Sequence, residues 1–131
     1  MRVLLADDSS LILTRMRELL MQNKGVEVVG MFGNGTDTLQ ALRSLKPDLA
    51  IVDIEMPGLS GLEVLSEIRK VDKSLTFVIL TLFTANAVRQ EAMDKGADYF
   101  FSKANGFTKI SSLLKTMLAK ERRVRMHGGI I

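Results

Sequence analysis

The chain has 131 residues, of which 47% are hydrophobic, so it is long enough to fold as one domain around one apolar core. It contains no cysteine, which excludes disulfides, thiolate catalysis and cysteine-based zinc sites. Its single histidine, His127, excludes a metal site built from several histidines. No run of about 18 apolar residues occurs, so we expect no membrane span and a cytoplasmic protein.

The net charge of +3 is concentrated at the C-terminal end. Residues 1–121 carry 15 basic and 15 acidic side chains, and the excess consists of Arg122, Arg123 and Arg125. Cations near the end of a helix interact favourably with its dipole, and no aromatic residues accompany them as in many nucleic-acid sites. We therefore expect a basic, flexible tail over residues 122–131 and no direct binding of nucleic acid.

Short apolar runs alternate with amphipathic segments along the chain. The runs predict strands at residues 2–6, 26–32, 49–52, 75–80 and 99–102. The segments between and after them predict a helix that begins near Ser9 or Ser10, helices over residues 36–45, 62–70 and 85–95, and a last helix with an apolar face from Ile110 to Leu118. Because each parallel step needs a helical crossover, this alternation predicts a doubly wound parallel sheet with helices on both faces.

Polar residues stand at the ends of four of the five predicted strands. Asp7 and Asp8 follow the first strand, Asp53 follows the third, Thr81 follows the fourth and Lys103 follows the fifth. Ligands of open α/β sheets bind at the carboxyl ends of the strands, where the winding direction reverses. If the strand order is 2-1-3-4-5, the first and third strands are neighbours about 5 Å apart, and the three carboxylates meet.

Three carboxylates at that separation repel one another, so either a proton is taken up or a cation compensates. Oxygen ligands favour a hard ion such as Mg²⁺, and the long stem of Lys103 is able to bring a second positive charge to Asp53. An aspartate in this setting is arranged to attack phosphorus and form an acyl phosphate. The hydroxyl of Thr81 is suited to donate a hydrogen bond to a phosphoryl oxygen. A movement of Thr81 toward that oxygen would couple phosphorylation to a change in the conformation of the protein.

Over about residues 1–120 the chain resembles the receiver domains of bacterial two-component response regulators. The resemblance rests on residues 4–8 (LLADD), 47–62 (PDLAIVDIEMPGLSGL) and 96–103 (GADYFFSK), together with Thr81. It implies a receiver domain at residues 1–121 with a flavodoxin-like sheet of order 2-1-3-4-5. It also implies a phosphorelay switch with no enzymatic activity beyond its own phosphorylation and dephosphorylation.

The resemblance assigns a role to each acidic residue of the predicted site. Asp53 corresponds to the phosphoacceptor and also to a Mg²⁺ ligand. Asp8 corresponds to a direct metal ligand, Asp7 to a ligand through water, and Glu55 to a ligand through its backbone carbonyl.

The resemblance also names the switch and the partners. Thr81 and Lys103 match the hydroxyl and the lysine that contact the phosphoryl group, and Phe100 matches the aromatic residue that changes rotamer. The donor would be a sensor histidine kinase or a histidine phosphotransfer protein. The fourth helix, fifth strand and fifth helix would form the partner face and a candidate homodimer face.

Three residues depart from the family pattern. Ala104 follows the lysine, where a proline with a cis peptide is common. Leu82 is bulky at a position that is often small, and we expect Leu82 and Phe83 to slow self-dephosphorylation. Phe100 has no hydroxyl, so no hydrogen bond of its own can favour an inward or an outward rotamer.

Three alternatives remain open. The chain also fits the receiver part of a DNA-binding transcriptional regulator, although we favour a single-domain regulator. A phosphatase with an aspartate nucleophile is a rival because Glu55 lies two residues after Asp53, although Asp7 and Asp8 on a separate strand and the lack of a cap domain argue against it. A further rival is a receiver that binds partners without being phosphorylated. The presence of all three aspartates, Asp7, Asp8 and Asp53, argues against it.

Overall fold

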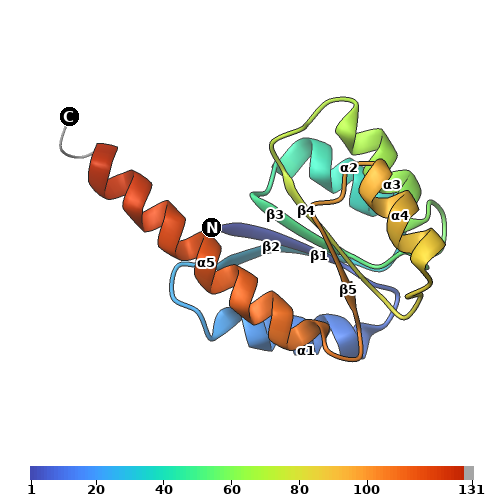
Figure 1. The fold of residues 1–131 in the computed structure, drawn as a ribbon, viewed down its shortest axis with the longest axis horizontal. Helices are drawn as coiled ribbons and strands as arrows, with labels where there is room; N and C mark the ends of the chain where they lie inside the picture. The colour runs from blue at the N-terminus through green and yellow to red at the C-terminus, as the bar shows by residue number, and fades with distance from the viewer. Residues whose placement is uncertain (129–131) are drawn as a thin grey trace.

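The computed structural model describes residues 1–128 and consists of one parallel sheet between two layers of helices (Figure 1). The strands are β1 (Arg2–Ala6), β2 (Glu27–Phe32), β3 (Leu49–Val52), β4 (Thr76–Thr81) and β5 (Tyr99–Ser102). The helices are α1 (Ser10–Met21), α2 (Gly35–Leu45), α3 (Gly61–Arg69), α4 (Asn86–Asp94) and α5 (Gly106–Gly128). The strand order is β2-β1-β3-β4-β5 and all pairs are parallel, which confirms the predicted doubly wound sheet.

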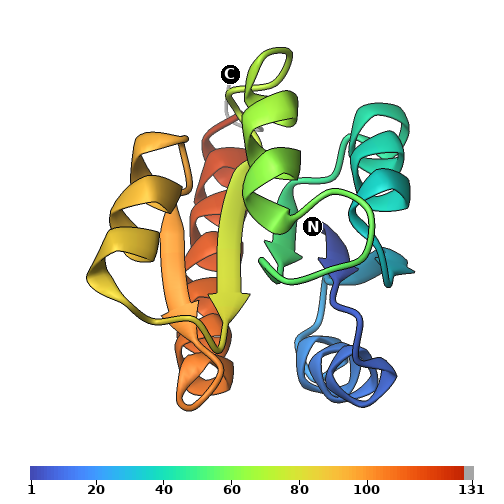
Figure 2. The ribbon, with the colours of Figure 1, turned by 90° about the vertical axis from the view of Figure 1, so that its right-hand side faces the viewer.

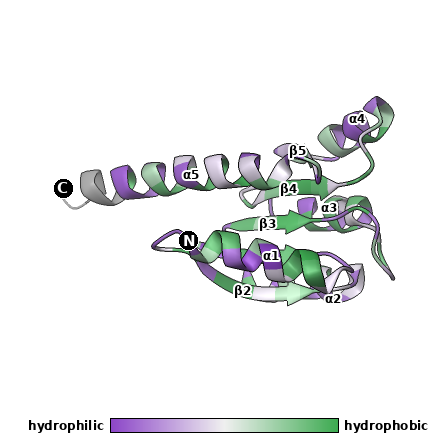
Figure 3. Cartoon of the chain, turned by 90° about the horizontal axis from the view of Figure 1, so that it is seen from below, coloured by the Kyte–Doolittle hydropathy of each residue, from purple (hydrophilic) through white to green (hydrophobic). Residues whose placement is uncertain are grey.

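The two helix layers bury opposite faces of the sheet (Figures 1 and 2). On one face α2, α3 and α4 pack over an apolar cluster that includes Leu42, Leu65 and Ala92. On the other face α1 and α5 pack over a second cluster that includes Leu20 and Leu114. Because both faces are covered, all four residues of β3 are buried, and the central strands are strongly hydrophobic along their length (Figure 3).

Side-chain caps fix where three of the helices begin. The Ser9 hydroxyl accepts a hydrogen bond from the N–H of Ile12 in α1, and the Asn34 side chain accepts one from the N–H of Asp37 in α2. Ser60 and Glu63 form a reciprocal capping box at the start of α3. The capped helices α1 and α3 follow the segments that carry Asp7, Asp8 and Asp53 at the carboxyl ends of β1 and β3.

Helix α5 differs from the expectation for the C-terminal region. It continues as far as Gly128, so residues 122–128, which we predicted as part of a flexible tail, are helical. No glycine or proline lies between Gly106 and Gly128, so nothing in this stretch interrupts the helical hydrogen bonds. The domain boundary at residue 121 stays a prediction, and residues 129–131 lie outside the described part. Among residues 1–128 no helix is long and apolar enough to cross a membrane.

The backbone at the end of β3 packs directly against the start of α3. The N–H of Gly61 donates to the carbonyl of Ile54 at 2.8 Å. A Cβ atom at position 61 would overlap the carbonyl oxygen of Asp53. A glycine is therefore required here so that α3 can begin beside the strand end that carries Asp53.

We expect Gly61→Ala to lower the free energy of unfolding by about 2–3 kcal/mol, because the methyl group forces the two backbone segments apart. Gly33→Ala is the matched control at the same edge of the sheet, since a Cβ there lies 3.8 Å from the nearest atom, the carbonyl oxygen of Asp7. Urea denaturation of both variants measures the difference. Equal losses of stability would contradict the close approach.

Candidate functional site

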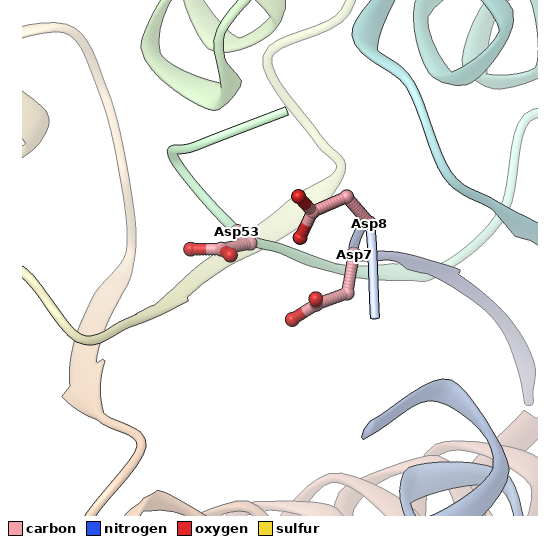
Figure 4. A group of neighbouring side chains, drawn as sticks. All are labelled: Asp7, Asp8 and Asp53. Carbon is pink, nitrogen blue, oxygen red and sulfur yellow. The ribbon is translucent and has the colours of Figure 1, made fainter. Parts of the chain in front are cut away.

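Three aspartates meet at the carboxyl end of the sheet (Figure 4). Asp7 and Asp8 follow β1 and Asp53 follows β3, and these strands are neighbours with Ala6 opposite Val52. One carboxylate oxygen from each aspartate lies within 4.8 Å of the others. The predicted convergence of the carboxylates is therefore confirmed.

Backbone hydrogen bonds fix the two inner aspartates. The N–H of Asp53 donates to the Ala6 carbonyl at 2.9 Å, and that of Asp7 donates to the Phe32 carbonyl at 3.0 Å. The Oδ1 atom of Asp53 accepts from the N–H of Ile54 at 2.8 Å, and that of Asp7 accepts from the N–H of Ser9 at 2.9 Å. Asp53 is 5% exposed and Asp7 is 1% exposed, whereas Asp8 is exposed. Two carboxylates of the cluster are therefore held in place and largely removed from water.

Lys103 brings one positive charge to this cluster. Its Nζ donates to Oδ2 of Asp53 at 2.9 Å and lies 2.6 Å from Oδ2 of Asp7. The second contact is an ion pair between the Lys103 ammonium and the buried Asp7 carboxylate. The sequence prediction that Lys103 reaches Asp53 across β4 is confirmed.

Burial and charge shift the pKa values of Asp7 and Lys103. Burial raises the pKa of Asp7 above its usual range, and this outweighs the lowering by Lys103 and by the Ser9 N–H. Burial by itself would lower the pKa of Lys103, but the contacts with Asp7 and Asp53 raise it by more. Lys103 is therefore charged at neutral pH.

The charges of the cluster do not balance. Three carboxylates face one ammonium, so a cation would offset the remaining negative charge. The carboxylate oxygens of three neighbouring aspartates fit a hard metal ion. The acidic cluster is therefore able to hold a metal ion.

Thr81 ends β4 beside this cluster and is fully buried. Its Oγ1 accepts a hydrogen bond from the N–H of Phe83 at 3.2 Å, which leaves the hydroxyl proton free to be donated elsewhere. The Thr81 carbonyl accepts from the N–H of Lys103 at 2.9 Å and joins the ends of β4 and β5. Leu82 and Phe83, which follow Thr81, are exposed, at 76% and 47%.

Phe100 points inward from β5 and is 4% exposed. The guanidinium group of Arg89 lies over its ring, with 4.7 Å from the guanidinium carbon to the ring centroid, and also donates to the Phe100 carbonyl at 3.1 Å. Sequence reasoning missed Arg89, because no short-range pattern connects a residue of α4 to a residue of β5. The inward position of Phe100 is thus supported by a neighbour and not by a group of its own.

The structure also locates Glu55 and Ala104. The Glu55 side chain is exposed, and the carboxylate cluster found among the described residues comprises the three aspartates without it. Its predicted role as a ligand through the backbone carbonyl stays a prediction. Residues 1–128 contain no cis peptide, so the bond before Ala104 is trans, and the N–H of Ala104 donates to Oγ of Ser102 at 3.1 Å. A proline at position 104 could not make that bond.

Residues 3–115 match the family model described as the response regulator receiver domain. The chain belongs to this family. Among curated relatives, a protein-glutamate methylesterase/protein-glutamine glutaminase of Methanospirillum hungatei is 34% identical over 114 residues, which are 86% of this chain and 33% of the relative. The response regulator GacA of Pseudomonas aeruginosa is 28% identical over 123 residues, which are 94% of this chain and 58% of the relative. The receiver chain thus spans about a third to a little over half of these relatives.

Solved receiver structures have the same fold. The response regulator domain of CheB from Thermotoga maritima gives a TM-score of 0.80 at 28% identity, with 92% of this chain and 94% of that chain covered. The non-phosphorylated receiver domain of the stress response regulator RcsB from Escherichia coli gives 0.82 at 27% identity, with coverage of 92% and 94%. These similarities confirm the resemblance that the sequence motifs indicated.

We expect Asp7→Asn to raise the free energy of unfolding at pH 7 by on the order of 1 kcal/mol in the absence of divalent metals. The pKa of Asp7 is raised in the folded receiver above its ordinary value of 3.8, so ionisation of Asp7 destabilises the fold as the pH rises above about 3.8. Asparagine does not ionise, so the gain should be present at pH 7 and vanish near pH 3. Urea denaturation at both pH values measures it.

The exposed neighbour Asp8 supplies the control for this experiment. Asp8→Asn removes an equal charge from the same cluster without removing a buried carboxylate, and it should change stability less. A gain for Asp7→Asn of the same size at pH 3 and pH 7 would contradict the assignment to ionisation.

Proposed function

We propose that this receiver is a phosphoryl-accepting switch of two-component signalling in which Asp53 takes a phosphoryl group from a phosphohistidine. The observation that carries the proposal is the buried Asp53 carboxylate, bonded to Lys103 and adjacent to Asp7 and Asp8. The donor would be a sensor histidine kinase or a histidine phosphotransfer protein. Membership of the receiver family supports this donor class.

Mg²⁺ is the cofactor that this donor set fits best. Asp7, Asp8 and Asp53, with the backbone carbonyl of Glu55, would hold it, and oxygen ligands are those that Mg²⁺ prefers. When bound, the ion would offset negative charge on the phosphoryl oxygens.

Different residues of the chain have different roles in the transfer of the phosphoryl group. An oxygen of the Asp53 carboxylate attacks phosphorus, and the bond from phosphorus to the donor imidazole nitrogen breaks with its electron pair staying on the imidazole. The product on this chain is an acyl phosphate. The Ile54 N–H restrains rotation of the attacking carboxylate, and the Lys103 ammonium offsets charge on the oxygens being transferred.

Thr81 would couple the presence of a phosphoryl group on Asp53 to a change at the protein surface. Its hydroxyl proton is available to a phosphoryl oxygen, and its movement would disturb the bond to the Phe83 N–H and the loop that leads to α4. Phe100 would change rotamer in the same transition, with α4, β5 and α5 as the partner face and a candidate homodimer face. The activity of the chain would be limited to its own phosphorylation and dephosphorylation.

A second candidate is that this receiver forms part of a longer DNA-binding regulator. The support is that the chain covers 58% of GacA, and that a receiver-containing structure 28% identical to it is described as a DNA-binding response regulator of the LuxR family from Staphylococcus aureus. In that case the phosphorylated surface would act on a partner domain, and direct contact of the receiver with nucleic acid is still not expected.

Acetyl phosphate with Mg²⁺ should add one phosphoryl group per chain to the wild type and none to Asp53→Asn. The acyl phosphate product is measured by intact-mass spectrometry, and chelation of Mg²⁺ should suppress it. Asp94→Asn, an exposed substitution on α4, is the matched control and should label normally. Labelling that persists in Asp53→Asn would refute the assignment, and steady turnover of a phosphomonoester would favour a phosphatase.

Replacing both Leu82 and Phe83 by alanine should speed the decay of the phosphorylated receiver by at least about threefold, because smaller side chains after Thr81 admit water more readily. Loss of label over time at fixed Mg²⁺ gives the decay rate. Val71→Ala, which truncates an exposed apolar residue outside the acidic site, should leave the rate unchanged. Equal decay rates of the phosphorylated wild type and the phosphorylated double variant would contradict this prediction.

A further inference from the structure

Helix α4 has few attachments to the rest of the molecule. Ala92 is its one buried residue, and Val88 is partly buried against the same apolar cluster. Its N-cap residue, Ala85, makes no side-chain hydrogen bond, unlike the caps of α1, α2 and α3. Since most helical stability comes from packing and capping, α4 depends strongly on any additional contact with the sheet.

Arg89 supplies such a contact. Its guanidinium group covers the Phe100 ring and donates to the Phe100 carbonyl at 3.1 Å. A planar guanidinium can stack on a ring and donate a hydrogen bond at the same time, which an ammonium group cannot do equally well. One side chain thus binds α4 to both the side chain and the backbone of β5.

Strand β5 is an edge strand that leads directly to the site. It has four residues, lies at the edge of the sheet, and pairs there with β4. Lys103 follows its last residue and places its ammonium against Asp53 and Asp7. A shift of β5 would therefore move the positive charge of the site.

We propose that Arg89 is a positioning residue that clamps α4 to β5 and so holds Lys103 against Asp53 and Asp7. The N-terminal end of α4 is also joined to the site through residues 82–85, where the Phe83 N–H donates to Thr81. Helix α4 is thereby connected to the site by two routes, and a partner that displaces it acts on Lys103 through Arg89. The consequence for phosphoryl transfer rests on the proposed function, whereas the clamp does not.

Amide hydrogen exchange tests the clamp in the unphosphorylated receiver. In Arg89→Ala the amides of α4 and β5 should exchange at least about fivefold faster, with those of the distant β2 unchanged. Gln90→Ala is the matched control, because Gln90 is an exposed α4 residue that bonds Asp94 within the same helix. Exchange in α4 and β5 that is the same in both variants would overturn the proposal.

Two further measurements distinguish a role of Arg89 in positioning Lys103 from a general loss of packing around α4 and β5. The NMR shifts of the Lys103 side-chain methylene next to Nζ should move in Arg89→Ala and stay in place in Gln90→Ala, and no movement would overturn the link to the site. Uptake of phosphoryl from acetyl phosphate should fall about fivefold in Arg89→Ala and recover in part in Arg89→Lys, which keeps the charge. Unchanged uptake in Arg89→Ala would also count against the link. If the wild type takes up no phosphoryl group, the proposed function fails, and the exchange and NMR results still decide the clamp.

Discussion

The contact of Lys103 with Asp53 and Asp7 is the interaction on which the rest of the site depends. Two carboxylates are buried at the edge of the sheet, and each would be costly to ionise there without a nearby positive charge. One ammonium offsets only part of the charge once the exposed Asp8 is included. The cluster is thus stable enough to form and still negative enough to favour a cation, which suits a site that must accept a phosphoryl group.

The parallel sheet makes this contact available because it places the ends of β1, β3 and β5 along one edge. Local backbone contacts then fix the position of Asp53. Gly61 lets α3 begin directly beside Asp53, and the backbone of β1 pairs with the N–H of Asp53. The central strand β3 is covered on both sides, whereas β5 lies at the edge of the sheet and α4 has one buried residue. The acidic cluster therefore lies at the covered centre of the sheet, and α4 and β5 lie at its side.

Some proteins that match the receiver are longer than this chain. Its curated relatives extend well beyond the aligned part, and α5 continues past the end of the family match at residue 115. Arg89 joins α4 to the ring and the backbone of Phe100 at the side of the sheet formed by β5. The relatives that match this chain are as different as a methylesterase and a response regulator.

The sequence by itself determined the strands, the helices and the identity of Asp7, Asp8, Asp53, Thr81 and Lys103 as residues at one edge, because these follow from local periodicity and from the ends of apolar runs. It did not determine the end of α5, since the basic run after residue 121 suits a solvated tail as well as a helix. Only the tertiary structure decided that Lys103 contacts two aspartates, that Phe100 lies inward, and that Arg89 covers it. Such contacts join side chains distant in sequence, and their geometry depends on how whole helices pack on the sheet.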